Sequence, residues 1–351
     1  MSRRPRLILS RQALAHNYQH LSSVVGKAEC AASIKADAYG LGIEFVALVL
    51  WEEGCRTYFV AYLEEALALR ELLHDATIYV FHGFDRRNFD IAKAACIRPV
   101  INLSEEALLP KIKELNPAVH VDTGMRRLGI PQYEMDRLLK LVERSKPSLL
   151  MSHLAKADEP ESMDNVTQLE RFNSIRNQLG DACPCSSLAN TAGILLGPPF
   201  HFELVRPGIG LYGGSPDPND PKGFKPVVTW QAQVIELQDV AMGESVGYGG
   251  AFLAPRALKL ATIGIGYADG YHRVLGGQGE LAIDGQICPI VGRVSMDLVT
   301  LDVSAIPTIK KGTWVEVMGP IISIDTVAVK ANTIGYELLT RLGSRMERVV
   351  V

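Results

Sequence analysis

The stretch Ala31-Ala-Ser-Ile-Lys35-Ala-Asp-Ala-Tyr39-Gly-Leu-Gly42 places a lysine at the end of a short apolar run. The run begins near Glu29 and is small and mostly apolar, which indicates a buried parallel strand. A loop of small residues follows, and then an amphipathic helix from about Ile43. A lysine among Ala and Ser has little water around its ammonium group, so its pKa should fall, and the neutral amine suits Schiff-base chemistry with an aldehyde. From position alone, a lysine that reaches the rim of its strand is the simpler interpretation.

Outward from this stretch, short apolar runs alternate with helical patterns from residue 30 to about residue 210. The expected strands are Ala31–Ile34, Thr57–Ala61, Thr77–His82, Pro99–Asn102, Ala118–Asp122, Ser148–His153, Ser186–Asn190 and Phe202–Arg206. The expected helices include Leu63–Leu73, Glu105–Leu115, Tyr133–Glu143 and Val166–Leu179. This alternation predicts a parallel α/β fold, and the strand count favours a TIM-type (β/α)8 barrel over an open sheet.

The pattern changes near the loop Ser215–Gly223, which is rich in proline and polar residues and marks a domain boundary. Beyond it, runs with strand character follow one another without helical periodicity until about Ser323. We therefore expect a barrel domain over residues 1–224 and a mainly-β domain over residues 225–351. Residues 1–10 are a candidate additional strand of the β domain.

The bulk composition excludes several classes of protein. A chain of 351 residues with 47% hydrophobic residues can fill two cores, and its net charge of −3 gives no reason to expect nucleic acid or an anionic membrane as partner. No apolar run approaches the ~18 residues of a membrane span, and Leu7–Ser10 is too short for a signal-peptide core, so a cytoplasmic location is expected. The six cysteines are expected to be reduced and mostly buried; Cys183-Pro-Cys185 lacks the second ligand pair of a zinc site, so no metal is expected.

The lysine stretch resembles the pyridoxal phosphate motif of alanine racemases, Val-Lys-Ala-Asn-Ala-Tyr-Gly-His-Gly. The resemblance recurs in order along the chain and reaches the second domain, where Glu244–Gly249 is similar to the family's Val-Ser-Tyr-Gly. The other similar stretches are His120–Gly129, Ser152–Glu159, Ala189–Gly193, Val205–Gly213, Gly264–Gly270 and Gly292–Asp297. Their breadth identifies the chain as a member of the alanine racemase family and implies pyridoxal 5'-phosphate as its cofactor.

The resemblance assigns cofactor and substrate contacts to the barrel. The cofactor residues that it implies are Lys35, Tyr39, His153, Thr191, Arg206, Gly208, Ile209 and, from the second domain, Tyr336. Arg127 is implied to orient substrate and cofactor, since its planar fork suits a carboxylate and a phenolic oxygen. One departure concerns its support: where many members carry a carbamylated lysine, this chain has His120. A neutral imidazole cannot supply the negative charge of a carbamate, so Arg127 is expected to be held differently.

Arg206 connects residue type to reaction outcome. By resemblance it faces the pyridine nitrogen of the cofactor, and an always-charged guanidinium leaves that nitrogen unprotonated. The ring is then a weaker electron sink, so that return of the proton to Cα is favoured over transamination.

In the second domain the resemblance makes Tyr248 the second catalytic base. Racemisation needs acid–base groups on opposite faces of a planar centre; Lys35 serves one face, and in this family the tyrosine comes from the partner chain, which implies a homodimer with shared sites. A tyrosine is a poor base at neutral pH, so a cationic neighbourhood is expected, with His153 and Arg206 as the candidates. The resemblance further implies that Met296 offers a backbone donor to the substrate carboxylate and that the entrance is lined by Tyr267, Asp158, Arg293 and Arg273, with Tyr336 narrowing it.

The sequence therefore predicts a racemase that interconverts L- and D-alanine and supplies D-alanine for peptidoglycan. The nearest alternative is a racemase of another small amino acid such as serine. A non-catalytic barrel that carries the same cofactor would lack residues 225–351, and a barrel-plus-β decarboxylase would need a carboxylate where Arg206 stands. A metal-dependent barrel hydrolase would need clusters of His and Asp at strand ends, which the sequence lacks.

Overall fold

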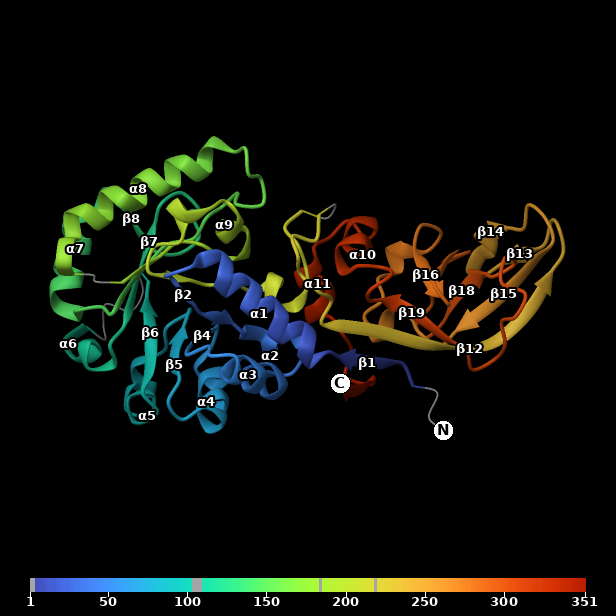
Figure 1. Ribbon diagram of the computed structural model, residues 1–351, viewed down its shortest axis with the longest axis horizontal. Coiled ribbons are helices and arrows are strands. Elements are labelled where there is room, and N and C mark those ends of the chain that lie inside the picture. Colours follow the sequence, from blue (N-terminus) through green and yellow to red (C-terminus); the bar gives the residue numbers. More distant parts are fainter. Residues whose placement is uncertain (1–3, 103–108, 183–184, 218–219) are drawn as a thin grey trace. The chain divides into compact units, whose positions relative to one another are not determined.

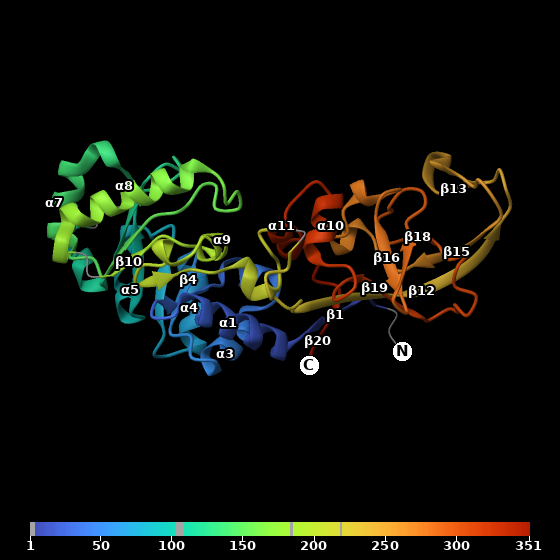
Figure 2. The same ribbon diagram turned by 45° about the horizontal axis from the view of Figure 1, so that its top comes forward.

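The computed structural model describes residues 4–102, 109–182, 185–217 and 220–351. The chain divides into two compact units. One unit, the barrel unit, is Ala15–Leu211, and the other, the β unit, joins the residues up to Leu14 to Tyr212–Val351. Figure 2 gives a second view of the elements of each unit.

The barrel unit is built from short parallel strands. They are β2 (Glu29–Cys30), β3 (Ala32–Ser33), β4 (Thr57–Val60), β5 (Thr77–Val80), β6 (Ile97–Ile101), β7 (Ala118–Asp122), β9 (Leu149–Met151), β10 (Ser186–Ser187) and β11 (Leu204–Val205), with β8 (Ile130–Pro131) added beside β7. Seven of them pair in the order β3-β4-β5-β6-β7-β9-β10, and β11 pairs with β2, which precedes β3 directly. Main-chain hydrogen bonds from Glu203 N to Ser186 O (3.2 Å) and from Arg206 N to Ala189 O (2.9 Å) join β11 to β10. The ring of strands is thus closed, and the predicted (β/α)8 barrel is confirmed.

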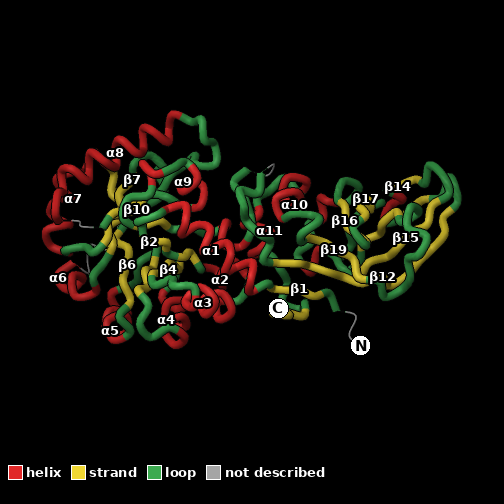
Figure 3. The backbone as a smooth tube through the Cα atoms, viewed as in Figure 1, coloured by secondary structure: helices red, strands yellow, loops and turns green. Residues whose placement is uncertain are grey.

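Helices surround these strands, as Figure 3 shows. They are α1 (Arg11–Val25), α3 (Ile43–Glu52), α4 (Leu63–Leu72), α5 (Phe89–Ala94), α6 (Leu109–Ile112), α7 (Met135–Ser145), α8 (Met163–Leu179) and α9 (Thr191–Leu195). Their apolar residues recur at helical spacing; α7, for example, buries Leu138, Leu141 and Val142. The predicted helix Glu105–Leu115 begins outside the described residues, and its described part is α6 with a 3-10 turn to Leu115.

Side chains from successive strands fill the interior of the barrel. The buried cluster contains Ala31, Phe59, Tyr79, Val100, Ala118, Leu149, Met151 and Leu204. Phe59 stacks on Tyr79 with ring centroids 5.0 Å apart. Because the interior is packed, a ligand has no room inside the barrel and must bind at the ends of the strands.

The segment after Lys35 differs from the loop that its small residues predict. In α2 (Lys35–Gly40), the four residues from Ala36 to Tyr39 have φ between 52° and 58°, which makes a left-handed helical turn. Such a turn costs about 1–2 kcal/mol for each L-residue because Cβ approaches the next carbonyl oxygen. The difference arises because tertiary contacts hold this backbone, whereas Ala, Asp and Tyr carry no local signal for it.

The β unit is organised around one long strand, β12 (Val228–Val240). It pairs with β1 (Arg6–Leu9), β15 (Leu258–Ile263) and β19 (Trp314–Met318), and β1 lies between β12 and the parallel strand β20 (Glu347–Val350). The remaining strands are β13 (Ser245–Val246), β14 (Phe252–Leu253), β16 (Glu280–Ile283), β17 (Gln286–Pro289) and β18 (Val299–Asp302), and the helices are α10 (Ile324–Lys330) and α11 (Gly335–Thr340). The mainly-β character that the sequence predicts is confirmed.

Three further expectations concern the described residues. Of the cysteines there, Cys30, Cys55 and Cys288 are buried, whereas Cys96 is exposed and Cys185 is half-buried; Cys183 lies outside them. Most of the described cysteines are therefore buried, as expected, and Cys96 is the exposed exception. Within the same residues, no helix is long and apolar enough to cross a membrane. No group of three or more His, Cys, Asp or Glu side chains that could hold a metal ion occurs in this part of the chain.

Candidate active site

Lys35 begins the left-handed turn at the end of β3. Its side chain is exposed at the residue level, and its Nζ lies 5.7 Å from the centroid of the Phe81 ring. Surrounding protein nevertheless lowers the pKa of Lys35, chiefly by burial and then by the charge of Arg127, while Glu65 acts in the opposite direction. The fall of the pKa expected from the sequence is thus present in the fold, and it increases the fraction of reactive neutral amine.

Tyr39, Thr191 and Gly208 come together beside this turn. A Cβ added at Gly208 would lie 2.3 Å from Tyr39 Oη, so only glycine allows the phenol to approach. The Thr191 hydroxyl accepts hydrogen bonds from the N–H groups of Gly208 (2.9 Å) and Gly210 (3.3 Å). Both Tyr39 and Thr191 are buried, and burial raises the pKa of Tyr39 to about 12, so its hydroxyl keeps its proton. The Tyr39 and Thr191 hydroxyls therefore converge beside the glycine loop, and both can donate to an anionic group.

The N-cap of α9 is Asn190, whose side chain accepts a hydrogen bond from Gly193 N at 2.9 Å. Thr191 is consequently not needed as a cap, and its hydroxyl is available to the glycine loop. Ile209, the other backbone donor that the resemblance implies, is buried in the same loop.

Arg206 is a buried cation that has no carboxylate partner among the residues the structure describes. It is 3% exposed, and its guanidinium donates to the Ser187 hydroxyl and to the carbonyl of Ser152 (2.6 Å). Burial lowers the pKa of Arg206 to about 9, so it remains protonated at neutral pH. A desolvated guanidinium that is held by neutral acceptors favours an electron-rich partner without requiring a full negative charge.

Both histidines at the strand ends are neutral. Burial, followed by the charges of Arg206 and Arg127, lowers the pKa of His153 well below its ordinary value. His153 therefore supplies no positive charge at neutral pH, and its expected part in a cationic neighbourhood for Tyr248 is wrong. Its carbonyl accepts a hydrogen bond from Gln168 at 3.0 Å, which fixes the end of β9 to α8.

His120 is held by Asn102, a residue that sequence reasoning did not single out. The Asn102 amide donates to the carbonyl of Phe81 at 3.0 Å, so its Oδ1 faces the Nδ1 of His120, 2.9 Å away. Nδ1 must then carry the proton, and Nε2 is left as an acceptor. Burial, and then the charge of Arg206, lowers the pKa of His120 to about 4, so this tautomer persists at neutral pH.

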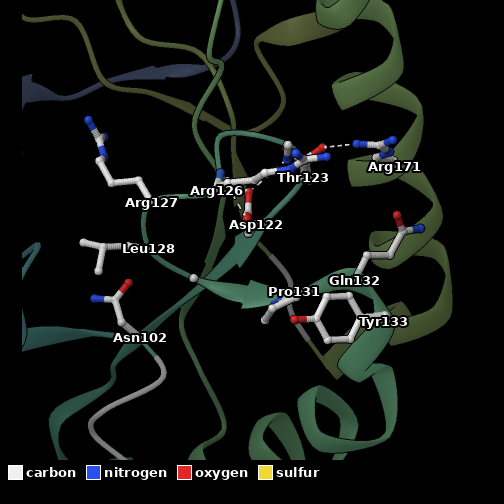
Figure 4. Close-up of a pocket in the computed structure, with 12 residues that line it drawn as sticks. Asn102, Asp122, Thr123, Arg126, Arg127, Leu128, Pro131, Gln132, Tyr133 and Arg171 are labelled. Atoms are coloured by element: carbon white, nitrogen blue, oxygen red, sulfur yellow. Dashed lines mark hydrogen bonds between the residues drawn. The ribbon is translucent and has the colours of Figure 1, made fainter.

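Arg127 borders a cavity of about 790 Å³ at the end of β7. Figure 4 shows Arg126, Arg127 and Arg171 on its wall, with the guanidinium of Arg127 directed away from the other two. The one carboxylate among the described lining residues, Asp122, accepts from the N–H groups of Gly124 and Arg126. Arg127 is exposed and retains its capacity for a ligand carboxylate. Asp158 is exposed on the loop between β9 and α8.

Tyr248 lies on the β unit in a turn between β13 and β14, and it is 71% exposed. Arg293 packs against this turn, since a Cβ added at Gly249 would lie 3.5 Å from its Nη1. The structure thus brings two of the predicted residues of the β unit together, and it places a cation beside the tyrosine.

Tyr267 and Met296 lie on two adjoining loops of the β unit. The N–H groups of Tyr267 and Ala268 donate to the carbonyls of Ser295 (3.1 Å) and Met296 (3.0 Å). The approach is so close that a Cβ at Gly266 would lie 2.3 Å from both carbonyl oxygens. Tyr267 and Met296 are 42% and 53% exposed, so these loops present them to the outside of the unit.

Arg345 clamps these two loops. It donates from Nε (2.6 Å) and Nη2 (3.1 Å) to the buried carboxylate of Asp269, and from Nη2 to Asp297 (2.6 Å). Asp269 also accepts from Gly266 N at 2.9 Å. Of the other predicted residues, Arg273 is exposed in a 3-10 turn, and Tyr336 is half-buried on α11.

Sequence reasoning missed Asn102, Glu65 and Arg345. Glu65 had a signal, because it stands at the third position of a helix, where a carboxylate caps the backbone. Asn102 and Arg345 act across 18 and 76 positions of sequence, and no local pattern marks such pairs.

The fold and the site together define a class of protein. Its members have a closed parallel barrel with a lysine at a strand end, followed by a mainly-β unit. The family description "Alanine racemase, N-terminal domain" matches residues 9–216, and "Alanine racemase, C-terminal domain" matches residues 227–350. The chain belongs to the alanine racemase family, which confirms the resemblance stated above.

Individual relatives are similar over nearly the whole chain. An alanine racemase of Methylobacterium nodulans is 44% identical and covers 98% of this chain and 95% of its own. A catabolic alanine racemase of Agrobacterium fabrum is 42% identical over 96% of this chain and 89% of its own. The crystal structure of alanine racemase from Bartonella henselae, with covalently bound pyridoxal phosphate, superposes with a TM-score of 0.92 at 36% identity and covers 99% of each chain.

Proposed function

We propose that this protein interconverts L- and D-alanine with pyridoxal 5'-phosphate as cofactor, by proton transfer between Cα and two bases. The observation that carries the proposal is the grouping of Lys35, the Tyr39–Thr191–Gly208 pocket and Arg206 at the strand ends of one barrel. A lysine with a lowered pKa, a cluster of phosphate-type donors and a buried guanidinium are the three features that such a cofactor needs.

The residues fit this cofactor. Lys35 would bind its aldehyde carbon, Tyr39, Thr191, Gly208 and Ile209 its phosphate, and Arg206 its ring nitrogen, with His153 and Tyr336 completing the contacts. When bound, the cofactor supplies an electron sink for the negative charge that develops at Cα. The close approach of the Tyr39 hydroxyl to Gly208 supports this grouping, since a side chain at Gly208 would displace the phenol.

The protein's own groups then move and hold the proton. Lys35 takes or returns the proton on one face of Cα, and its lowered pKa increases the fraction of the neutral base. Arg127 holds the substrate carboxylate at the mouth, with a backbone donor from Met296. Because Arg206 keeps its own proton, it would leave the ring nitrogen unprotonated, which favours return of the proton to Cα.

The second base is Tyr248 of a partner chain, in a homodimer whose domains divide at residues 1–224 and 225–351. Three exposed residues support this proposal: Tyr248, Met296 and Tyr267 all stand out from the β unit. Arg293 beside the Tyr248 turn provides the positive charge that a tyrosine base requires. Together with Arg273 and Asp158, it would line the entrance. We place the enzyme in the cytoplasm, where it supplies D-alanine for peptidoglycan.

The decisive experiment is exchange of the Cα proton in D₂O against a panel of L- and D-amino acids. Purified protein with pyridoxal phosphate should exchange and invert alanine fastest in both directions. Faster turnover of serine than of alanine would favour serine, the alternative substrate. Absence of exchange with every amino acid, despite bound cofactor, would favour a non-catalytic carrier and contradict the proposal.

The physiological role is tested separately. Deletion of the gene should make growth dependent on added D-alanine. A deletion strain that grows without D-alanine but not on D-alanine as carbon source would instead indicate a catabolic role.

A further inference from the structure

Glu65 uses its two carboxylate oxygens for two different purposes. Its Oε2 accepts hydrogen bonds from the N–H groups of Ala61 (2.7 Å) and Tyr62 (3.1 Å), which caps α4 as a helix-initial carboxylate commonly does. Its Oε1 reaches away from α4 and accepts from Ala36 N at 2.6 Å. Capping its own helix would need only the first of these oxygens, so the second contact calls for a different explanation.

The second contact is with Ala36, the residue directly after Lys35. Ala36 is the first of the four residues in the left-handed turn, and its N–H belongs to the peptide that Lys35 begins. Other bonds also support the turn, among them Ala38 N to Ile34 O (2.9 Å), Gly42 N to Asp37 O (3.0 Å) and Ile43 N to Asp37 Oδ1 (2.7 Å). All of these lie within the segment itself, whereas the bond from Ala36 ties it to a neighbouring helix.

We propose that Glu65 is a positioning residue for Lys35: its carboxylate ties Ala36 N to the first turn of α4 and so fixes the direction in which the amine leaves β3. The inference rests on the proposed function in that it takes Lys35 as the reactive amine. A carboxylate is suited to the task because each oxygen can accept independently, while the rigid start of α4 provides the anchor.

The charge of Glu65 acts on the amine as well. Burial and the charge of Arg127 lower the pKa of Lys35, and the charge of Glu65 raises it. Glu65 is half-buried, and it forms no ion pair with a Lys or Arg side chain in the described parts of the chain. The negative charge of Glu65 therefore acts on Lys35. Substitutions of Glu65 can separate this effect of its charge from its effect on the position of the amine.

Two variants make this separation. Glu65→Asp keeps the charge and can still cap α4, but it is one methylene too short to reach Ala36. Glu65→Gln keeps the length and removes the charge, and its amide nitrogen cannot accept from an N–H group. Glu64→Gln is the matched control, since Glu64 is an exposed acid in the same helical turn.

Two readouts are measured on the full-length protein. The first is the dissociation constant of pyridoxal phosphate together with kcat for alanine. We expect both E65D and E65Q to weaken cofactor binding and lower kcat by 10- to 100-fold, roughly the effect of a 1 Å misplacement, with E64Q unchanged. The second is the pH midpoint for reductive methylation of Lys35 in cofactor-free protein, followed by peptide mass spectrometry.

The midpoint should move to lower pH in E65Q, because the charge that opposes deprotonation is gone, and stay near its original value in E65D. A residue that only caps α4 would lower the melting temperature and leave the midpoint and kcat in place. If E65D and E65Q match E64Q in cofactor affinity, kcat and midpoint, the inference is wrong.

Hydrogen–deuterium exchange of the unsubstituted protein provides a measurement that does not depend on folding of the variants. Ala36 is exposed, so protection of its N–H must come from Glu65, and exchange at the unprotected rate would overturn the inference. The methylation and exchange experiments need no racemase activity. A protein that shows both effects but turns over no amino acid would retain the positioning role of Glu65 and lose the proposed function.

Discussion

The barrel unit buries several of its predicted site residues, whereas the β unit leaves most of its own exposed. In the barrel unit, Arg206, Tyr39 and Thr191 are buried and held by hydrogen bonds within the same chain. In the β unit, Tyr248, Tyr267 and Met296 are 71%, 42% and 53% exposed. The first set is held within its own unit, whereas the side chains of the second set are presented to the outside of the β unit.

The two units also differ in whether their cationic side chains form ion pairs. The barrel unit gathers Lys35, Arg127 and Arg206, none of which forms an ion pair with a described carboxylate. Burial, and then the charge of Arg206, lowers the pKa of the two nearby histidines, so both are neutral. In the β unit, Arg345 is paired with both Asp269 and Asp297. Unpaired cations at strand ends are disposed toward an anionic ligand, while a paired cation is disposed toward holding loops together.

Removing the amine tests the barrel side most severely. In Lys35→Ala, the visible absorbance of the bound cofactor and racemase activity should both be lost, with activity falling by more than about 10³-fold because no other described group can replace the amine. Absorption spectra and racemisation assays measure the two effects, and circular dichroism checks that the barrel is intact. Persistence of the absorption band would remove Lys35 from its assigned role.

Mixed dimers test whether the β side serves a partner. Tyr248→Phe should reduce abstraction from one enantiomer by about 10²-fold or more and affect the other less, measured as solvent-isotope exchange of each. Dimers that combine a Lys35→Ala chain with a Tyr248→Phe chain contain one site with both bases, so about half of the unsubstituted activity should return. No recovery in confirmed heterodimers would mean that the sites are not shared.

The neutral histidines of the barrel predict a loss of stability in acid. Since the pKa of His120 is about 4 in the folded chain and near 6.5 when unfolded, the unfolded state binds more protons between these values. The unfolding free energy should therefore fall as the pH is lowered from 6.5 to 4, by up to about 3 kcal/mol from this residue. Urea titrations across this range should give a flatter acid limb for His120→Asn than for the exposed control His74→Asn. Equal slopes for the two variants would contradict the assignment of His120 as a neutral, buried histidine.

The smallest effect is expected from substitution of Arg345, which tests how the β unit holds its site residues. In Arg345→Ala the two loops that carry Tyr267 and Met296 lose their clamp, so KM for alanine should rise about 10-fold while kcat changes little. Cofactor affinity, which depends on the barrel, should be unchanged. Asp297→Asn breaks only one of the two ion pairs and should give an intermediate KM. A fall in kcat without a change in KM would exclude this role.

Sequence patterns predicted the barrel because its signals are local. Most of its strands, which are two to five residues long, stand between helices, and several site residues lie just after a strand, as Lys35 lies after β3 and His153 after β9. The same reasoning placed the return of helical periodicity near Ser323, which is the N-cap of α10.

What could not be predicted depends on contacts between distant residues. The left-handed turn after Lys35 arises from bonds such as Ala36 N to Glu65, and its residues are ordinary L-residues without a glycine to announce the backbone. The lowered pKa of His153 depends first on its burial in the assembled barrel and then on Arg206 and Arg127, which are remote in sequence. The Asn102–His120 hydrogen bond, which fixes a tautomer, likewise requires the barrel to be assembled.

Strand β1 has a consequence for anyone who dissects the chain into pieces. Because Arg6–Leu9 lies between β12 and β20, a fragment that starts at Tyr212 lacks a central strand and leaves two sheet edges open to aggregation. Supplying residues 4–10 as a synthetic peptide, or attaching them behind Val351 through a flexible linker one strand length long, should close the gap. The β unit is thus suited to split-protein complementation, in which recovery of a soluble fold reports that the missing strand has arrived.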